Sequence, residues 1–426
     1  MCGIYGFIGF KDDKLLEEMG KSLAHRGPDD QDFYQKDLVN LGYRRLSIID
    51  VKKSFQPLYN EDKSIVLLFN GEIYNFKELR GKLSKHKFTT DGDGETVIHW
   101  YEEYGLEGLK ELNGMFAISL YDIKKQKVYL IRDHFGIKPL YYTTDPFIYA
   151  SEIKAILKKI KPKPNNKVIQ KYLLTRAHDD TEETFFESIK RVPSGSYLEF
   201  DLKTEKHIIK RFWSLSGLDP CSDKGPTLVS RFKELFLDSV KLRLISEVPV
   251  GTALSGGLDS SAVVCTVPNL KTFSAVFPNE INNEEAYVDE VVRRTGVRAY
   301  KIYPKVEEFW QDIEKLISFQ DEPMISTGPY AQWKVMEKAH AEGIKVIIDG
   351  QGADEMLAGY IPYHFVYFKE LFNQKKYWQL VKEIIFSWDL IIPLIKDKFK
   401  SRVNTNELFT FARGPLARQE VLLNNR

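Results

Sequence analysis

Cysteine is scarce in this sequence. The 426 residues include three, Cys2, Cys221 and Cys265. They are too few and too widely spaced for a disulfide framework, and no two of them form a CxxC metal or redox pair. No signal peptide is recognisable at the start of the chain. Together these absences predict a reducing, cytoplasmic location.

The sequence also has almost no net charge. Lysine and arginine number 61 and aspartate and glutamate 60, which leaves a formal charge of +1 at pH 7. A chain that binds nucleic acid or an anionic membrane through its bulk charge carries a clear positive excess. No apolar run is long enough to span a bilayer, and the most apolar late stretch, residues 387–398, is broken by Asp389 and Pro393. We therefore expect neither nucleic acid nor a membrane as a partner.

The length and composition are those of a globular protein with more than one core. Hydrophobic residues make up 43% and charged residues 28% of the chain, which is longer than one core usually supports. In the front part, strand patterns rich in β-branched and aromatic residues alternate with helical patterns. This mixture predicts an α+β arrangement of sheets layered with helices. The expected strands are 42–51, 64–75, 115–122 and 126–142, and the expected helices are 14–25 and 95–112.

A change of composition predicts the domain boundary. Residues 201–227 are polar and contain Gly, Pro and Ser, so they predict a linker between a front domain, 1–200, and a second domain, 228–426. The second domain alternates strand and helix patterns, which predicts a doubly wound parallel sheet of the α/β class. Its expected buried strands are VPVGTAL, KTFSAVF and IKVIIDG.

The segment SGGLDSS, residues 255–261, follows the first of these strands and precedes a helical stretch. Gly256 and Gly257 permit a tight turn and a close approach of the backbone to a ligand, and Ser260 and Ser261 offer hydroxyl groups. The N-terminus of a helix behind such a loop binds anions such as phosphate. The GK[ST] ending of a Walker A loop is missing. An ordinary strand-to-helix turn is the alternative.

A second acidic loop follows a later strand. It begins at Asp349 and includes Asp354 and Glu355. In a doubly wound sheet both loops lie at the carboxyl ends of strands, where ligands bind. Asp259 of the first loop would then join Asp354 and Glu355 in holding Mg²⁺ against a pyrophosphate group. A solvated acidic loop is the alternative.

The two loops resemble those of a known enzyme family. SGGLDSS is similar to the pyrophosphate loop of the ATP pyrophosphatases, which cleave ATP between the α and β phosphates and activate a carboxylate as an acyl-adenylate. Together with GQGADEMLAGY, it resembles the synthetase domain of glutamine-hydrolysing asparagine synthetases. The resemblance implies ATP and Mg²⁺ as cofactors. The nucleotide contacts that it implies are Ala253, Ser255, Gly256, Gly257, Asp259, Ser260, Ser261, Ala275, Asp349 and Gly350.

The front part resembles the glutaminase domain of the same family, which is a class II amidotransferase domain. The resemblance covers about residues 1–365 and implies an N-terminal nucleophile hydrolase αββα sandwich. An adenine-nucleotide hydrolase-like domain that is C-terminally short would follow it. Eight motifs in order carry the front part of the resemblance: MCGIYGF, AHRGPDD, YRRLSIID, FNGEIYN, GDGE, NGMFAISLYD, RDHFGIKPLYY and SEIKAI.

Cys2 is the catalytic nucleophile that this resemblance implies. Removal of Met1 would give Cys2 both a thiol and a free α-amine, whose reference pKa of about 7.7–8.0 suits a general base. Thiolate attack on the glutamine amide forms a thioester and releases ammonia, and water then frees glutamate. Because the terminal amine supplies the base, we interpret His25 and His134 as structural. We interpret Cys265 as a small core residue.

The resemblance also assigns the residues around the glutamine. Asn70 and Gly71 form the oxyanion hole, a side-chain amide and a backbone N–H directed at the developing negative charge. Arg45 binds the substrate α-carboxylate, for which a planar guanidinium is suited. Glu72 and Asp93 hold the α-ammonium group, although the acidic segment DGDGET leaves the alignment at Asp93 open to a slip.

The sequence departs from the family pattern at two places. Gln351 stands where the family usually has the glutamate proposed as the synthetase base, and a glutamine cannot accept a proton. Another group, a water chain or Asp349 would have to serve, or the acceptor differs. The late lysine and the GLExRxPFLD-like segment of the family are not recognisable, so we expect a second domain that is incomplete at its C-terminus. A fragment, a truncated product and a divergent member all remain open, and such a domain would expose apolar surface.

The leading hypothesis is glutamine-dependent asparagine synthesis. Glutamine, aspartate and ATP would be the substrates, and a homodimer is left open as the assembly. One alternative is a related amidotransferase that acts on another carboxylate, such as a sugar acid or a peptide. Another is a truncated member that retains only glutaminase or scaffold function. SGGLDSS argues against the class II enzymes that make phosphoribosylamine or glucosamine phosphate.

Overall fold

The structure is a computed structural model, and it describes residues 1–177, 179–219, 221–278 and 283–388. Within these ranges, no helix is both long enough and apolar enough to cross a membrane. Most of the apolar stretch 387–398 and the whole of the late segment after it lie outside the described residues.

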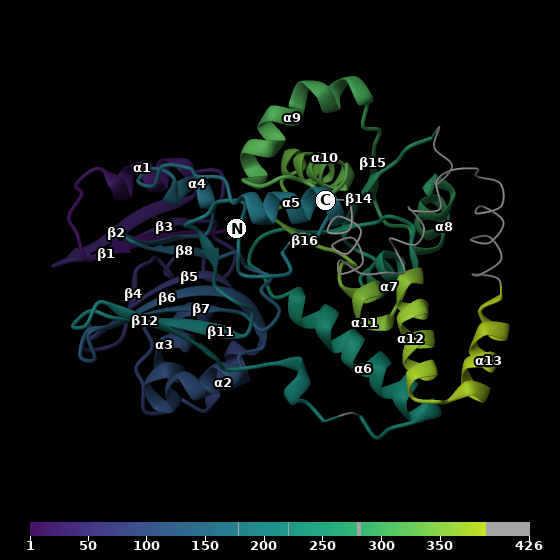
Figure 1. The fold of residues 1–426 in the computed structure, drawn as a ribbon, viewed down its shortest axis with the longest axis horizontal. Helices are drawn as coiled ribbons and strands as arrows, with labels where there is room; N and C mark the ends of the chain where they lie inside the picture. Colours follow the sequence, from purple (N-terminus) through teal and green to yellow (C-terminus); the bar gives the residue numbers. More distant parts are fainter. Residues whose placement is uncertain (178, 220, 279–282, 389–426) are drawn as a thin grey trace, which may run out of the picture.

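The front part is built on two six-stranded antiparallel sheets (Figure 1). The first sheet has the order β10-β8-β9-β1-β3-β2 and consists of β1 (Gly3–Ile8), β2 (Asp30–Lys36), β3 (Val39–Arg45), β8 (Tyr141–Thr144), β9 (Phe147–Ala150) and β10 (Lys190–Arg191). The second has the order β12-β11-β7-β6-β5-β4 and consists of β4 (Leu58–Tyr59), β5 (Ile65–Ile73), β6 (Gly114–Asp122), β7 (Lys127–Arg132), β11 (Ser196–Asp201) and β12 (Lys206–Arg211).

Helices cover the outer face of each sheet, which completes an αββα sandwich. In Figure 1, α1 (Leu15–Ser22) and α4 (Ile153–Ile156) lie over the first sheet. Beneath the second sheet lie α2 (Phe76–Gly81), α3 (Asp93–Tyr104) and the 3-10 helix η1 (Gly105–Glu111). Both faces of β1 are apolar because both are covered. Tyr5 and Phe7 pack under α1, whereas Ile4 and Ile8 pack between the sheets. The sandwich expected from the front motifs is thus confirmed.

Two expected strands are shorter than predicted. The strand expected over 42–51 ends at Arg45, and the residues after it form a loop against the second part of the chain. The strand expected over 126–142 is interrupted after Arg132. There the buried carboxylate of Asp133 accepts hydrogen bonds from four backbone N–H groups, those of Phe116, Phe135, Ile137 and Lys138. Three of these four bonds are local, to residues 135, 137 and 138, and they fold the chain into a turn that strand periodicity does not encode.

The expected linker also needs a correction. Its first part contains β12, which pairs along its whole length with β11 and extends the second sheet. The exposed, alternating sequence of Lys206–Arg211 fits an edge strand that carries charged side chains to solvent. The rest of 201–227 holds the short 3-10 helix η2 (Leu215–Gly217) and the beginning of α6 (Gly225–Arg243). The ordered sandwich therefore continues past residue 200.

The second part contains a four-stranded parallel sheet in the order β15-β14-β13-β16, as expected. Its strands are β13 (Val250–Ala253), β14 (Lys271–Ala275), β15 (Ala299–Ile302) and β16 (Val346–Ile348). Helices lie on both faces, so the sheet is doubly wound. One face packs against α7 (Leu258–Thr266) and α8 (Glu285–Thr295), and the other against α10 (Gly328–Ala341). The remaining helices are α5 (Asn166–Thr175), α9 (Val306–Gln320), α11 (Ala353–Leu357), α12 (Ile361–Asn373) and α13 (Tyr377–Phe386).

The strand order places the two acidic loops side by side. From β13 the chain adds β14 and β15 on one side and returns to add β16 on the other. The loops after β13 and β16 therefore leave the same edge of the sheet from neighbouring strands. This reversal is the point at which doubly wound sheets bind ligands.

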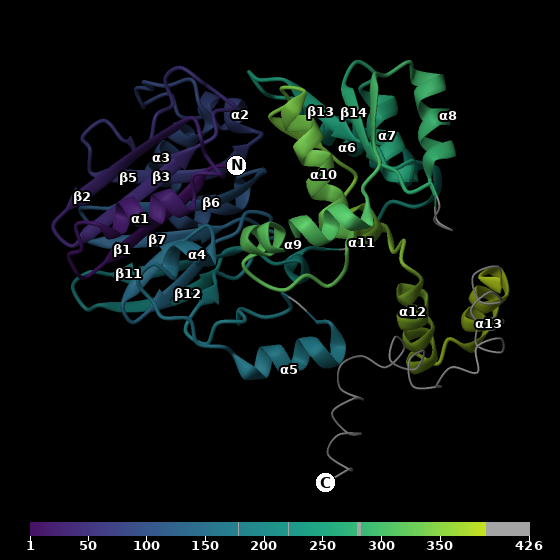
Figure 2. The same cartoon turned by 90° about the horizontal axis from the view of Figure 1, so that it is seen from above.

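Apolar side chains are widely exposed in the second part, as the sequence led us to expect. Leu258 is 86% exposed and Trp378 is 90% exposed. Helices α12 and α13 pack against each other and project away from the parallel sheet (Figure 2). Cys265 was expected to be a small core residue, and this expectation was wrong, because its side chain is exposed. On α7 the buried side chains are Ser260, Val263 and Val264, so Cys265 lies off the buried face of the helix.

The C-terminal end of α9 joins the second part to the sandwich. Asp321 accepts from the Lys154 N–H at 3.2 Å and pairs with the Lys154 ammonium at 3.3 Å. Glu322, which is 5% exposed, accepts from the Phe185 N–H at 2.8 Å and forms an ion pair with the buried Arg191. The two carboxylates tie the end of one helix to two separate segments of the front part.

We expect Glu322→Ala to lower the free energy of unfolding by roughly 3 kcal/mol, because it leaves a buried guanidinium with one of its carboxylate partners removed. Urea unfolding monitored by tryptophan fluorescence measures this loss. Glu314→Ala, an exposed position on the same helix, is the matched control and should lie within about 0.5 kcal/mol of the wild type. Equal stabilities of the two variants would contradict the role given to Glu322.

Candidate functional site

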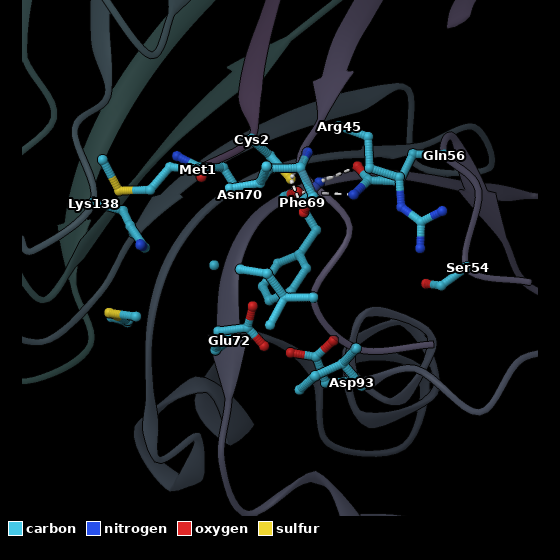
Figure 3. Close-up of a pocket in the computed structure, with 15 residues that line it drawn as sticks. Met1, Cys2, Arg45, Ser54, Gln56, Phe69, Asn70, Glu72, Asp93 and Lys138 are labelled. Atoms are coloured by element: carbon cyan, nitrogen blue, oxygen red, sulfur yellow. Dashed lines mark hydrogen bonds between the residues drawn. The ribbon is translucent and has the colours of Figure 1, made fainter. Parts of the chain in front are cut away.

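A pocket in the front part brings together the side chains expected around glutamine (Figure 3). It lies where the start of β1, the end of β3, the middle of β5 and the first turn of α3 meet. Because these segments are separate in sequence, the fold is what assembles them. The expected residues that line the pocket are Cys2, Arg45, Asn70, Gly71, Glu72 and Asp93.

Cys2 is half-buried and its thiol contacts the backbone of Leu46. The Leu46 N–H donates to Sγ at 3.4 Å, and the thiol donates to the Leu46 carbonyl at 3.6 Å. Burial raises the pKa of the Cys2 thiol. The Cys2 carbonyl accepts from Arg26 Nε at 2.9 Å, and Arg26 pairs with Glu152 at 2.8 Å. Cys2 is thus held in place through both its thiol and its carbonyl, as a nucleophile has to be.

The amine at the start of the chain is buried beside this thiol. It belongs to Met1 in the full sequence, and burial lowers its pKa from 8.0 to about 5, with a smaller effect of Arg26. An amine with a lowered pKa is neutral at neutral pH and has a lone pair available for a proton.

The outer edge of β5 presents a row of backbone amides to the pocket. The side chain of Gln56 donates to the Phe69 carbonyl at 2.9 Å and accepts from the Phe69 N–H at 2.7 Å. The Ile73 N–H donates to Asp93 Oδ2 at 2.8 Å. Alternate residues of a strand direct their amides to the same edge, so the N–H of Gly71, between these two, is directed at the pocket.

Asn70 is the clearest sign that the pocket receives a polar ligand. It is 1% exposed, and within the described residues neither its amide nitrogen nor its amide oxygen has a hydrogen-bond partner. Oε2 of Glu72 is likewise buried and has no hydrogen-bond partner within the described residues. An unpaired buried polar group costs about 1–3 kcal/mol, so it calls for an explanation in a folded protein. A ligand that hydrogen-bonds to the Asn70 amide supplies one.

Contacts with the following loop hold the Arg45 side chain in one orientation at the pocket. It is 4% exposed, and its guanidinium donates to the carbonyls of Asp50 at 2.8 Å and Val51 at 3.1 Å. The ring of Phe55 lies 5.1 Å from the guanidinium carbon. These contacts orient the planar group while leaving it further N–H donors, and a guanidinium binds a carboxylate through two such donors.

Two buried carboxylates line the opposite side of the pocket in Figure 3. Burial raises the pKa of Asp93 to about 6, and burial together with the nearby Asp93 raises the pKa of Glu72 well above its usual range. Asp91 of the same segment is exposed and pairs with Lys53 at 2.8 Å. Glu95, its third acidic residue, accepts hydrogen bonds from Thr89 and Thr90 and is not among the residues that line the pocket. Asp93 is therefore the residue of the DGDGET segment that reaches the pocket.

Lys138 is a pocket residue that the sequence reasoning missed. It is 5% exposed, lines the same cavity, and burial lowers the pKa of its ammonium group. Ser54 and Gln56 line the pocket as well. A lysine inside the largely apolar motif RDHFGIKPLYY was the available signal for Lys138, whereas nothing in the sequence around Ser54 or Gln56 distinguishes these two.

His25 and His134 both lie outside the residues that line the pocket. His25 Nε2 lies 3.0 Å from a carboxylate oxygen of Glu152. The ring of His134 packs against three aromatic rings, and burial lowers its pKa. These geometries agree with the structural interpretation of both histidines. The rings around His134 are those of Phe116, Phe212 and Trp213.

The glycine turn in the second part has the expected strand–turn–helix form. It follows β13 directly, and α7 begins three residues after Ser255. Gly256 has a φ of +90°, and a Cβ added there would lie 2.9 Å from a side chain of α8, so the turn needs glycine. Ser255 Oγ accepts from the Gly257 N–H at 3.2 Å and lies 3.0 Å from Ser260 Oγ. The serines thus brace the turn in front of the helix N-terminus.

The loop after β16 packs against this turn. A Cβ added to Gly350 would lie 2.9 Å from the Asp259 Cβ and 2.9 Å from the Ser260 N, so the two loops touch where they leave the sheet. Asp349 is half-buried, burial raises its pKa, and its Oδ1 accepts from the Gln351 N–H at 3.1 Å. Gln351 itself is exposed.

The remaining expected residues lie at the same edge. Ala253 and Ala275 end β13 and β14, and Asp354 lies in the first turn of α11. In the part of the chain that the structure describes, neither Asp259 nor Asp354 belongs to a group of three or more metal-binding side chains. A magnesium ion at this edge would take oxygen ligands from phosphate groups, as Mg²⁺ often does, and it stays a prediction.

Comparison with known proteins assigns a description to each half of the chain. The family model described as a glutamine amidotransferase domain matches residues 1–213, and the model described as asparagine synthase matches residues 231–422. The glutamine-hydrolyzing asparagine synthetase 2 of Bacillus subtilis is 34% identical over 84% of this chain and 52% of its own length. A provisionally named glutamine-hydrolyzing asparagine synthetase 2 of Methanocaldococcus jannaschii is 34% identical over 85% of this chain and 76% of its own length.

This chain is shorter than such relatives, spanning 52% and 59% of the lengths of two from Bacillus subtilis. Among solved structures, glutamine phosphoribosylpyrophosphate amidotransferase from B. subtilis matches with a TM-score of 0.38 and 16% identity, over 73% of this chain and 70% of that chain. So weak a likeness carries no conclusion about this chain.

We expect Asp93→Asn to stabilise the fold above pH 6 by up to about 3 kcal/mol. Burial raises the pKa of Asp93 from 3.8 to about 6, and each pKa unit corresponds to about 1.4 kcal/mol. The stability that the protonated group contributes is complete below about pH 4 and is lost as the pH rises through 6. Asparagine keeps an acceptor for the Ile73 N–H without carrying a charge.

Urea unfolding at pH 4 and pH 8 measures this effect, and the difference between Asp93→Asn and the wild type should appear only at pH 8. Asp91→Asn is the matched control, because the pKa of Asp91 is lowered by its exposed pair with Lys53. It should give no gain at either pH. A gain of the same size for both variants, or for neither, would refute the burial argument.

Proposed function

The chain belongs to the glutamine-hydrolysing asparagine synthetase family, and on that premise we propose that it makes asparagine from aspartate, with glutamine as nitrogen donor and ATP as activating substrate. The observation that carries the proposal is the buried, unpaired amide of Asn70 beside the thiol of Cys2. A thiol and an unpaired amide donor that line one pocket support glutamine hydrolysis by a nucleophile and an oxyanion hole.

Glutamine hydrolysis follows from the residues of this pocket. After removal of Met1, the α-amine of Cys2 takes the thiol proton, and the thiolate attacks the side-chain amide carbon. The Asn70 amide and the Gly71 N–H stabilise the negative charge that develops on the amide oxygen. Ammonia leaves, and water cleaves the thioester to release glutamate. Arg45 binds the α-carboxylate of the substrate, and Glu72 and Asp93 bind its α-ammonium group.

The raised carboxylate pKa values fit this last role. A substrate ammonium group between Glu72 and Asp93 would stabilise their ionised forms, so the two carboxylates give up protons when glutamine binds. Glutamine binding should therefore weaken as the pH falls below 6.

The second half would activate the acceptor. The aspartate carboxylate attacks the α-phosphorus of ATP, which forms an acyl-adenylate and releases pyrophosphate; ammonia then displaces AMP. The amides at the start of α7 and the serines of the glycine turn would bind the pyrophosphate. Asp259 and Asp354 would hold Mg²⁺, which neutralises phosphate charge when bound. Ala253, Ala275, Asp349 and Gly350 would contact the nucleotide.

Because Gln351 cannot accept a proton, another group has to act as the base in the synthetase half. Asp349 is the carboxylate that contacts Gln351, and its raised pKa makes it a better proton acceptor than an ordinary aspartate. We propose that Asp349 accepts the proton that the attacking ammonia loses, while the Gln351 N–H donates a hydrogen bond to the Asp349 carboxylate.

We expect a diazo-oxo-norleucine adduct on Cys2 of a chain that has lost Met1. Intact-mass spectrometry measures both changes at once. Cys2→Ala should abolish the adduct and lower glutaminase activity about a thousandfold or more, because the nucleophile is lost. Cys265→Ala, an exposed cysteine elsewhere, is the matched control and should label normally. A retained Met1, or an adduct that persists in Cys2→Ala, would contradict the glutaminase assignment.

We expect aspartate-dependent exchange between ATP and pyrophosphate, and a loss of about a hundredfold or more in Asp259→Ala, because a ligand of the phosphate-bound ion is removed. Asp238→Ala, an exposed aspartate on α6, is the matched control. Exchange supported only by a sugar acid or a peptide carboxylate would refute aspartate as acceptor. Absence of exchange with any acid would refute the synthetase half while leaving the glutaminase test intact.

A further inference from the structure

Two histidines and two glutamates converge at α3, apart from the residues that line the pocket. Glu61 follows β4, His86 follows α2, and His99 and Glu102 lie on α3 itself. Each offers one ligand atom, and these four atoms all lie within 4.8 Å of one another. In the described ranges no other set of three or more such side chains is this close.

We propose that Glu61, His86, His99 and Glu102 bind one divalent transition-metal ion, with Zn²⁺ as the best fit. Two imidazole nitrogens with two carboxylate oxygens form a donor set that zinc accepts in tetrahedral geometry. Mg²⁺ prefers oxygen ligands alone and fits the set poorly.

The distances suit a tetrahedron. Ligands bound to zinc at about 2.0–2.1 Å are separated from one another by about 3.4 Å. Nδ1 of His99 lies 2.9 Å from Oε2 of Glu102 and 3.6 Å from Oε2 of Glu61. Nδ1 of His86 lies 3.7 Å from the same Glu102 oxygen and 3.3 Å from Oε1, the other oxygen of Glu61. The four separations bracket the expected value, and one oxygen of Glu61 would have to turn toward both rings when an ion binds.

The outer nitrogens of both rings also face carboxylates. Nε2 of His86 lies 3.3 Å from Glu103, and Nε2 of His99 lies 3.8 Å from Glu95. Neither Nε2 has a hydrogen-bond partner among the described residues, but a proton on it would face a carboxylate, and the lone pair of the other nitrogen would then be free for a metal. In both histidines that other nitrogen, Nδ1, is the one directed at the centre.

Both glutamates also accept hydrogen bonds from groups outside the cluster. Oε1 of Glu102 accepts from the Asn60 amide at 2.7 Å, which directs Oε2 toward the histidines. Oε1 of Glu61 accepts from the Lys87 N–H at 3.0 Å. His99 is fully buried, so a neutral ring there would set its lone pair against carboxylate oxygens unless a cation lay between them. A proton on each ring is the competing arrangement.

The bound ion would join three segments of the front part. It would tie the loop after β4 and the loop after α2 to α3, and the first residue of α3 is Asp93. Its expected contribution is therefore to stability, through preferential binding to the folded chain.

The test uses the full chain stripped with EDTA and then titrated with Zn²⁺ or Co²⁺. In the absence of nucleotide we expect one ion per chain by calorimetry, tetrahedral Co²⁺ bands in the visible spectrum, and no binding of Mg²⁺. At a hundredfold excess of Zn²⁺ over its dissociation constant, the melting temperature of the front domain should rise by about 5–10 °C.

Glu61→Gln and His86→Gln should each weaken Zn²⁺ binding at least about a hundredfold and remove the Co²⁺ bands. Glu61 is exposed, so its variant should fold, and circular dichroism verifies this. Glu78→Gln, an exposed glutamate on α2, is the matched control and should bind as the wild type does. Zinc bound at the thiol of Cys2 would persist in both ligand variants. Binding that survives both variants, or no binding by the wild type, overturns the proposal.

Discussion

The ladder between β5 and β6 is the constraint on which the glutaminase pocket depends. A Cβ at Gly71 would lie 2.2 Å from the Met115 carbonyl oxygen, so β5 can lie this close to β6 only with glycine there. With β6 on one side, alternate amides of β5 all face the opposite edge. Gln56 occupies the amide of Phe69, Asp93 occupies that of Ile73, and the amide between them is directed at the pocket. One antiparallel pairing thus sets the direction of the proposed oxyanion donor and the place of the carboxylate proposed to bind the substrate.

The loop that follows β3 joins this pocket to the second half of the chain. At its start, the Leu46 N–H contacts the Cys2 thiol. At its end, the amides of residues 50 and 51 donate to Glu247, which lies just before β13. Between them, the Ser47 N–H donates to Asp29, and Asp29 also pairs at 2.8 Å with Lys345, just before β16. The loop beside Cys2 is therefore held by the segments that lead into β13 and β16. These are the two strands after which the acidic loops begin.

The two halves differ in how completely they are covered. In the sandwich each sheet has a helical layer on one face and the other sheet on its second face, so even β1 is buried throughout. In the second half the sheet is covered, but helices such as α6 and α13 have large apolar side chains at the surface, including Phe232 and Phe386. The proposed ATP site at the edge of that sheet has the strand order and the glycine turn described above, while the surface around it is the more open part of the molecule.

Much of the site was predictable from short motifs, because each carries its chemistry in a few adjacent residues. Cys2, Arg45 and Asn70 were identified in this way, and the pocket contains all three. The turn at Gly256 was predictable because it needs a positive φ, which glycine tolerates. The course of the loop after β3 was not, because residues as remote as Glu247 bond to it. Nor was the burial of Lys138, which lines the pocket together with residues remote in sequence.

The sequence by itself determined the alternation of strands and helices and the glycine turns, and it singled out Cys2 as the candidate nucleophile, since each depends on side chains that are neighbours along the chain. Only the tertiary structure decided which of the two aspartates, Asp91 or Asp93, reaches the pocket, and that His86 and His99 share one cluster with Glu61. The physical reason is that burial and side-chain distance arise from packing between segments that are remote in sequence, and no local pattern specifies them.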